Sequence, residues 1–290
     1  IEYLAKQYQT IGLVPGNKNS FYQAVPMAKV TPDQNMQLVI GEHKFKAGQD
    51  FTARTQQVDG SVTLDNTELV FVGYGINAPE YQWNDYANVD VKGKAVVVLV
   101  NDPGFATQND ALFTGNAMTY YGRWTYKYEE AARQGAKAVF IVHQTAPAAY
   151  PWSVVESSNT GSKYTLVDSE NNISKLPIMG WIQHAVAETI FTDAGLSFDE
   201  MQHYALNPGF KAVSLPQSAN LTLNSAIKNA ESNNVVAMIE GESRADEYIV
   251  ISAHWDHFGT KQTANGPKIY NGAIDNATGS AATVELARIL

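Results

Sequence analysis

Residues 126–143, "YKYEEAARQGAKAVFIVH", contain the pattern that decides the fold of most of the chain. Their first part predicts a helix that ends at Gly135, because glycine readily adopts the left-handed conformation found just after a helix. Ala138 to Val142 then form an unbroken apolar run, which is typical of a strand buried on both faces. A helix followed at once by such a strand predicts an α/β unit.

The same pattern recurs on both sides of this stretch. Strands are predicted at "ELVFVGYGI" and at Ala95 to Val100, within "VDVKGKAVVVLVND". "LPIMGWI" and "HAVAETIFTDAG" supply one more strand and helix. This compact βαβαβ series predicts at least some parallel pairing.

The two flanks of this series have a different pattern. The N-terminal flank starts with a helix, "IEYLAKQYQTIGL", and continues in short strands. From about residue 218, "ANLTLNSAIKNAESNNVVAMIEGE" predicts two strands joined by a polar turn, and the strand "YIVISAH" and a helix over 278–290 follow. We therefore expect an α/β fold with a mixed sheet: a discontinuous domain of residues 1–61 and 216–290, into which a smaller α/β domain, residues 62–215, is inserted.

Composition excludes several classes of function. The 290 residues are 44% apolar but contain no unbroken stretch long enough to span a membrane. Acidic residues exceed basic ones by nine, and the 20 Lys and Arg are scattered, so a nucleic-acid partner is not expected. With no cysteine, His, Asp and Glu are the available metal ligands. The three Asn-x-Ser/Thr sequons, at Asn172, Asn220 and Asn276, are a common chance pattern, and glycosylation is not expected there.

Both ends of the sequence lack the usual signals. The first helix has no N-capping residue and no leader before it, and the last helical pattern reaches Leu290 without a C-capping glycine. We expect the chain to be a fragment of something longer, with a signal peptide missing from it.

The segment "AHWDHFG" places two histidines and an aspartate after a predicted strand. His254 and Asp256 are two residues apart, so on an extended strand they would leave on the same side, while His257 would point away. A carboxylate beside a histidine is a common way to fix the ring of a metal ligand. The simpler interpretation is a structural histidine at a strand end.

The later segment "NGAIDNATGSAATVEL" strengthens the metal hypothesis. Asp275 lies in a glycine-rich turn at a helix start, where Asn276 and Thr278 can act as caps. Gly272 and Gly279 allow close backbone approach. An aspartate after the His-x-Asp segment, across a polar loop, predicts a site at the carboxyl edge of the sheet.

"AHWDHFG" followed by "YNGAIDNATGSAATVELAR" resembles the co-catalytic two-zinc aminopeptidases and carboxypeptidases, the family of aminopeptidase Y, glutamate carboxypeptidase II and the transferrin receptor ectodomain. "LVFVGYGI", "DVKGKAVVVL" and "GRWTYKYEEAARQGAKAVFIVH" resemble the protease-associated (PA) domain that many bacterial members carry as an insert. The resemblance thus covers nearly all of the chain.

The resemblance implies a zinc metallo-aminopeptidase that acts on the N-terminal bonds of peptides. It implies that His254 binds one zinc, that Asp256 is a catalytic residue that orients the site, and that Asp275 bridges two zinc ions. It also implies a cis bond between Asp275 and Asn276, and a periplasmic or secreted bacterial enzyme. The family's Glu-Glu pair, a further Asp and a final His have no counterpart here, so residues 1–290 alone are expected to be inactive.

Several questions stay open at this level. The main alternative is a non-catalytic binding protein of the same architecture; a nucleotide-binding module is disfavoured because "NDPGFATQN" lacks a glycine-rich phosphate loop. The rings of "TYYGRWTYKY" either line the approach to the site or pack within the insert. The other histidines are interpreted as structural or surface residues: His43, His143, His184 and His203. The preferred N-terminal residue and the oligomeric state are not predicted.

Overall fold

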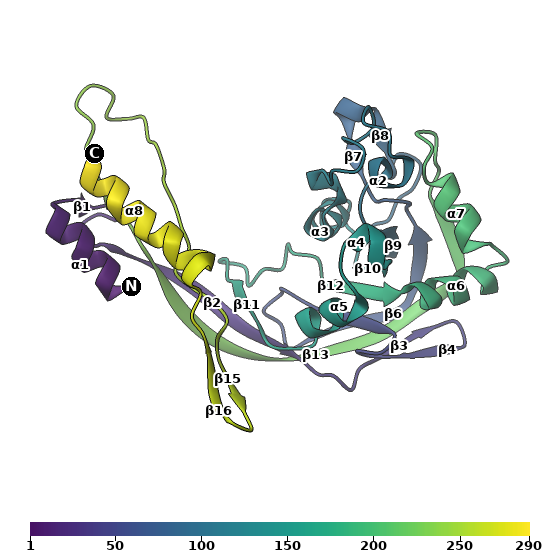
Figure 1. The fold of residues 1–290 in the computed structure, drawn as a ribbon. Coiled ribbons are helices and arrows are strands. Elements are labelled where there is room, and N and C mark those ends of the chain that lie inside the picture. Colours follow the sequence, from purple (N-terminus) through teal and green to yellow (C-terminus); the bar gives the residue numbers. More distant parts are fainter. The chain divides into compact units, whose positions relative to one another are not determined.

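The structure is a computed structural model that describes residues 1–290. Contacts divide the chain into two compact units: unit 1 comprises Ile1–Pro26 and Glu231–Leu290, and unit 2 comprises Met27–Ala230. Two long strands, β2 (Tyr22–Pro32) and β13 (Val213–Val235), contribute residues to both units (Figure 1). No helix of the protein has the length and apolar character needed to cross a membrane.

A mixed sheet of ten strands forms the framework of unit 2, and its order is β11-β2-β13-β6-β9-β10-β12-β5. Off this path, β3 pairs with β13, and β4 pairs with β3. The central strands β6, β9, β10 and β12 are parallel to one another, which confirms the predicted parallel pairing. The flanking pairs are antiparallel. Besides β2 and β13, the strands are β3 (Gln37–Ile40), β4 (His43–Lys46), β5 (Phe51–Arg54), β6 (Ser61–Phe71), β9 (Ala95–Leu99), β10 (Ala138–His143), β11 (Lys163–Leu166) and β12 (Ile178–Gln183).

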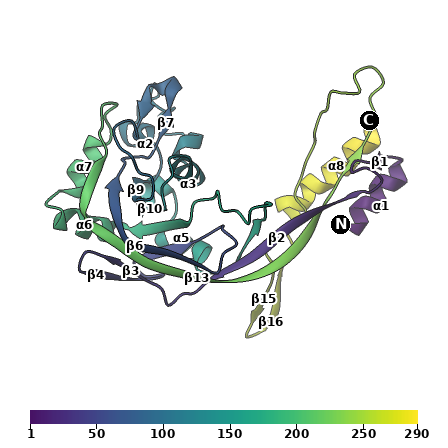
Figure 2. The ribbon, with the colours of Figure 1, turned by 180° about the vertical axis from the view of Figure 1, so that it is seen from behind.

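Helices cover both faces of the parallel strands, and every residue of β9 and β10 is buried as a result. Val96 and Val98 pack with side chains of α3 and α5 on one face, whereas Val97 and Leu99 pack with α6 and α7 on the other. Figure 2 shows these helices from behind. The helices of unit 2 are α2 (Pro103–Thr107), α3 (Trp124–Arg133), α4 (Thr145–Ala148), α5 (Trp152–Asn159), α6 (His184–Asp193) and α7 (Phe198–Tyr204), with short turns at Pro79–Tyr81 and Tyr120–Gly122 and a small hairpin of β7 (Asn77–Ala78) and β8 (Trp83–Asn84).

The boundaries of the two units differ from the expected ones at residues 61/62 and 215/216. β5 pairs with β12, and β3 pairs with β13, so strands from the N-terminal flank complete the sheet of the expected insert. β13 itself pairs with β6 from Val213 to Asn224. The contacts therefore group residues 27–61 and 216–230 with residues 62–215.

Unit 1 joins the two ends of the chain. β1 (Val14–Pro15) pairs with β14 (Ala237–Met238), and α1 (Glu2–Ile11) lies against α8 (Thr278–Ile289) (Figures 1 and 2). The hydroxyls of Tyr8 and Thr283 are 2.8 Å apart and share a hydrogen bond. Residues of the N-terminal and C-terminal flanks thus contact each other within unit 1. A hairpin of β15 (Gly259–Thr263) and β16 (Gly266–Tyr270) completes the unit.

Two strand predictions in the C-terminal flank are wrong. The polar stretch after residue 218 does not turn, because β13 continues through it to Val235 and pairs with its neighbours along the way. Residues 248–254 form no strand, and Ile249 is 95% exposed. No neighbouring strand pairs the backbone of this segment, and a strand requires such a partner for its N–H and C=O groups.

The aromatic stretch of the insert is mostly packed within unit 2. Tyr126 and Tyr128 are buried, and the Tyr121 ring lies edge-on against Tyr126 with a centroid distance of 4.9 Å. Tyr120 and Trp124 are partly exposed. The buried rings support the packing interpretation for the central residues of this stretch.

The first of the three sequons is inside the protein. Asn172 is 1% exposed, and its amide Nδ2 donates hydrogen bonds to the carbonyls of Gln56 at 2.8 Å and Leu166 at 2.7 Å. Its Oδ1 accepts a bond from the backbone N–H of Asp168 at 3.0 Å. The side chain therefore ties the loop after β11 to the segment after β5.

A lysine is buried at the carboxyl end of β9. Lys127, on α3, is fully buried, and its ammonium donates to the backbone oxygen of Asn101 at 2.8 Å and lies 5.9 Å from the centre of the Tyr74 ring. Burial lowers the pKa of Lys127 to about 7, against a partial opposing effect of Asp85 and Asp102. Burial also raises the pKa of Asp85 to about 7. This cluster makes the stability of unit 2 depend on pH.

We expect the unfolding free energy to rise between pH 7 and pH 9, and the Lys127→Met variant to lose most of that rise. The folded-state pKa of Lys127 lies below its ordinary value of 10.5, so in this window the unfolded chain binds more protons than the folded one. One such proton contributes at most about 1.4 kcal/mol per pH unit. Urea unfolding at several pH values measures the slope. Lys163→Met, at an exposed position of β11, is the control and keeps the wild-type slope; an unchanged slope in Lys127→Met would contradict the prediction.

Candidate metal centre

The structure brings His254, Asp256 and Asp275 together within unit 1. The Nε2 atom of His254 lies 3.0 Å from Oδ1 of Asp275, and its Nδ1 atom lies 3.3 Å from Oδ1 of Asp256. Nδ1 also lies 3.1 Å from the backbone oxygen of Asp256. Both ring nitrogens thus face acidic acceptors, and all three side chains are more than half exposed.

This arrangement arises without the strand that the sequence predicted. His254 and Asp256 lie in an irregular segment, so the side chains meet through a local bend rather than through the alternation of a strand. Two carboxylates beside one imidazole form a group of oxygen and nitrogen donors of the kind that binds a cation. A proton on Nε2 and a metal ion would occupy the same place on the ring.

Asp275 lies in the turn Ala273–Ala277, whose backbone is non-helical at Asp275 and Asn276 and which leads directly into α8. The peptide bond from Asp275 to Asn276 is cis, as the family resemblance implies. The Oδ1 atom of Asn276 accepts the backbone N–H of Gly279 at 3.1 Å, which confirms Asn276 as a cap of the helix start. Thr278 instead donates its hydroxyl to the backbone oxygen of Ile274 at 2.8 Å.

Two supporting contacts were not predicted from the sequence. The hydroxyl of Ser280, in the first turn of α8, donates to the backbone oxygen of His254 at 3.2 Å. The indole N–H of Trp255 donates to the backbone oxygen of Asn233, near the end of β13, at 3.2 Å. Both contacts join residues far apart in the sequence, and no local pattern indicates them.

Unit 1 also contains a hollow of about 380 Å³ beside the three residues. Residues of α1 and α8 form half of its lining, and Asp256, His257 and Asn276 line it as well. The candidate site therefore opens onto a space with an apolar wall, formed in part by Leu4, Trp255 and Val284.

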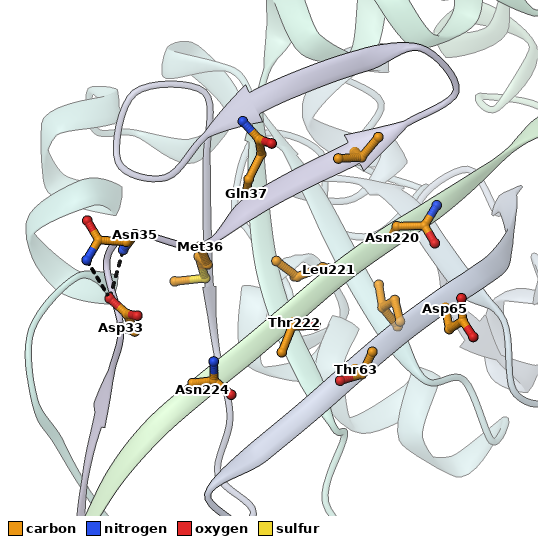
Figure 3. A pocket seen from close by; sticks show the side chains of 12 residues that line it. Asp33, Asn35, Met36, Gln37, Thr63, Asp65, Asn220, Leu221, Thr222 and Asn224 are labelled. Atoms are coloured by element: carbon orange, nitrogen blue, oxygen red, sulfur yellow. Dashed lines mark hydrogen bonds between the residues drawn. The ribbon is translucent and has the colours of Figure 1, made fainter.

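A larger hollow, of about 540 Å³, lies in unit 2 between the loop after β2 and the strands β6 and β13 (Figure 3). Its lining combines amides, hydroxyls and the carboxylates of Asp33 and Asp65 with apolar side chains such as Met36 and Leu221. Oδ1 of Asp33 accepts two hydrogen bonds from Asn35, at 2.9 and 3.1 Å. No histidine lines this hollow, so it offers none of the imidazole ligands found in unit 1.

The remaining histidines that the sequence left as structural take no part in the candidate site. His43 pairs with Asp193 at 2.7 Å, and His184 lies 3.4 Å from Glu188. His143 is buried, and its Nε2 lies 2.9 Å from the backbone oxygen of Tyr150. No group of three or more His, Asp or Glu side chains in the protein is arranged to hold a metal ion.

Comparison with known protein families assigns the segment that carries the three residues. Residues 234–290 match the model of peptidase family M28. The matched range includes His254, Asp256 and Asp275, and it lies within unit 1.

Solved structures that match include two of BSAP, a zinc aminopeptidase from Bacillus subtilis. The sequence identities are 17% and 16%, and the TM-scores are 0.33 and 0.34. Each match covers 100% of this chain and 50% of the BSAP chain. The chain thus spans about half the length of the structures it matches.

We expect Trp255→Phe to loosen the segment that carries His254. The variant keeps the apolar ring but loses the hydrogen bond to Asn233, and a neutral hydrogen bond contributes about 1 kcal/mol. Amide hydrogen exchange of residues 254–257 should accelerate by roughly fivefold, the factor that corresponds to that energy. Trp152→Phe is the matched control, since its indole N–H also donates to a backbone oxygen, that of Gly48, within unit 2. Equal exchange in Trp255→Phe and the wild type would show that this bond does not hold the segment.

Proposed function

We propose that the protein is a zinc-dependent aminopeptidase that releases N-terminal residues from peptides, with His254 and Asp275 as metal ligands. The observation that carries the proposal is the 3.0 Å approach of His254 Nε2 to Asp275 Oδ1 within the segment that matches peptidase family M28. The proposal extends to two zinc ions per site, bridged by Asp275, as the family resemblance implies.

The donor types fit zinc, which binds imidazole nitrogen and carboxylate oxygen. The number of donors within residues 1–290 is smaller than a zinc site requires, because no group of three metal-ligating side chains is present. When bound, zinc supplies a Lewis acid that activates water and polarises a peptide carbonyl. We accordingly propose that residues 1–290 alone do not turn over peptides.

The residues of this chain would act by holding and orienting ligands. Asp256 faces the Nδ1 side of His254, so a proton on Nδ1 leaves Nε2 free to bind a metal. Asp256 is in this sense a positioning residue of the site. Asp275 offers a carboxylate with two oxygens directly before α8, and the exposed position of all three side chains leaves the site open to a peptide.

We expect Asp275→Ala in the full-length protein to abolish hydrolysis of amino-acid p-nitroanilides. The wild-type enzyme should lose the same activity on treatment with a chelator and regain it with added zinc, because the reaction depends on the bound metal. The matched control is Asp246→Ala, which removes an exposed aspartate of unit 1 and should leave turnover unchanged. Near-normal turnover in Asp275→Ala, or turnover that resists chelation, would exclude this function.

A non-catalytic binding protein is the second candidate. The observation that favours it is the absence of any group of three metal-ligating side chains in residues 1–290. Isothermal titration of the full-length protein with zinc separates the two candidates: the aminopeptidase binds zinc and loses binding in His254→Ala, whereas the binding protein shows neither effect.

We further propose that residues 62–215 correspond to a protease-associated domain, and that the protein is secreted or periplasmic. The parallel strands covered by helices on both faces support an independent α/β core for this part of unit 2. Peptide substrates are the partners that follow from an aminopeptidase.

A further inference from the structure

We propose that the contact between Gly272 and His257 is the positioning contact that holds Asp275 against His254. This inference rests on the proposed function for its consequence, metal binding, but its geometry is independent of that function. In this proposal His257 is not a metal ligand. Its side chain packs against the backbone at Gly272.

The two segments approach each other too closely for any side chain at position 272. A Cβ atom built on Gly272 would lie 2.8 Å from Cγ of His257, 2.9 Å from its Cβ and 2.8 Å from the backbone oxygen of Asp275. Gly272 also has φ +63°, in the left-handed region that favours glycine. Its carbonyl accepts the N–H of Ala277 at 3.0 Å, so the backbone is held on the side of the following turn as well.

The equal sequence spacing in the two segments explains how this contact places Asp275 beside His254. Gly272 is three residues before Asp275, and His257 is three residues after His254. The contact between Gly272 and His257 therefore brings Asp275 close to His254. The hairpin between them fixes the register from the other direction, since Gly259 pairs with Tyr270 and the rings of Phe258 and Tyr270 meet edge-on at 6.0 Å.

The test compares two glycines on either side of the β15–β16 hairpin, Gly259 at the start of β15 and Gly272 after β16. Gly272→Ala and Gly259→Ala both place alanine at a positive φ, +63° and +70°, but nothing lies within 4 Å of a Cβ on Gly259. The difference between the two variants therefore isolates the close approach from backbone preference. Circular dichroism and thermal unfolding establish that each variant folds.

The first readout needs no metal. In the metal-free chain, nuclear Overhauser effects between the His254 ring and the Asp275 side chain should be present in the wild type and in Gly259→Ala, and lost in Gly272→Ala. The second readout is the zinc affinity of the full-length protein by isothermal titration: Gly272→Ala should weaken binding by about tenfold or more, the usual effect of disturbing the support of a ligand. Gly259→Ala should stay within about twofold of the wild type, as expected for an exposed substitution.

A second substitution tests the partner. His257→Gly removes the two side-chain atoms that a Cβ at 272 would meet, so the double variant His257→Gly with Gly272→Ala should recover part of the lost affinity and of the Overhauser effect. Recovery supports the contact, and additive losses overturn it. A loss in His257→Gly alone as large as that in His254→Ala would make His257 a ligand and also overturn it.

The two proposals fail in different ways. If His254→Ala leaves zinc binding unchanged, the proposed function fails while the Overhauser comparison still decides the geometry. If zinc binding depends on His254 but Gly272→Ala and Gly259→Ala behave alike in both readouts, the positioning contact is wrong and the metal site stands.

Discussion

The arrangement of helices in unit 2 follows from the burial of the parallel strands β9 and β10 on both faces. All of their residues are buried, which no arrangement with helices on one side alone could achieve. α3 and α5 supply one layer and α6 and α7 the other. Lys127 lies on the buried face of α3, where a backbone oxygen and an aromatic ring replace water around the ammonium.

The local pattern of the sequence was sufficient for this central part of the fold. β9 and β10 follow the predicted apolar runs, and α3 is followed by Gly135 with φ +77°, as its sequence indicates. The pattern failed where pairing partners are distant. β13 stays extended through a polar stretch because β6, β2 and β3 lie beside it, and residues 248–254 are not a strand because nothing does. The same distant pairings moved the boundaries of the compact units away from residues 61 and 215.

For the candidate site, residue types and spacing predicted more than secondary structure did. His254, Asp256 and Asp275 meet although the strand expected to present them is absent. The sequence also indicated Gly272 as a place of close backbone approach, since glycine-rich turns allow it. It could not indicate Ser280 or the bond from Trp255 to Asn233, because a hydroxyl or an indole has many possible partners and only the folded chain selects one.

The interior position of Asn172 has a consequence for how the protein can be produced. Its Asn-Ile-Ser sequence nevertheless has the acceptor pattern for asparagine glycosylation in a eukaryotic secretory pathway. A glycan on Nδ2 would take the place of the bonds to Gln56 and Leu166 and has no room at a residue that is 1% exposed. A host that does not attach glycans to asparagine allows this loop to close, whereas a glycan attached to Asn172 before folding would keep it open.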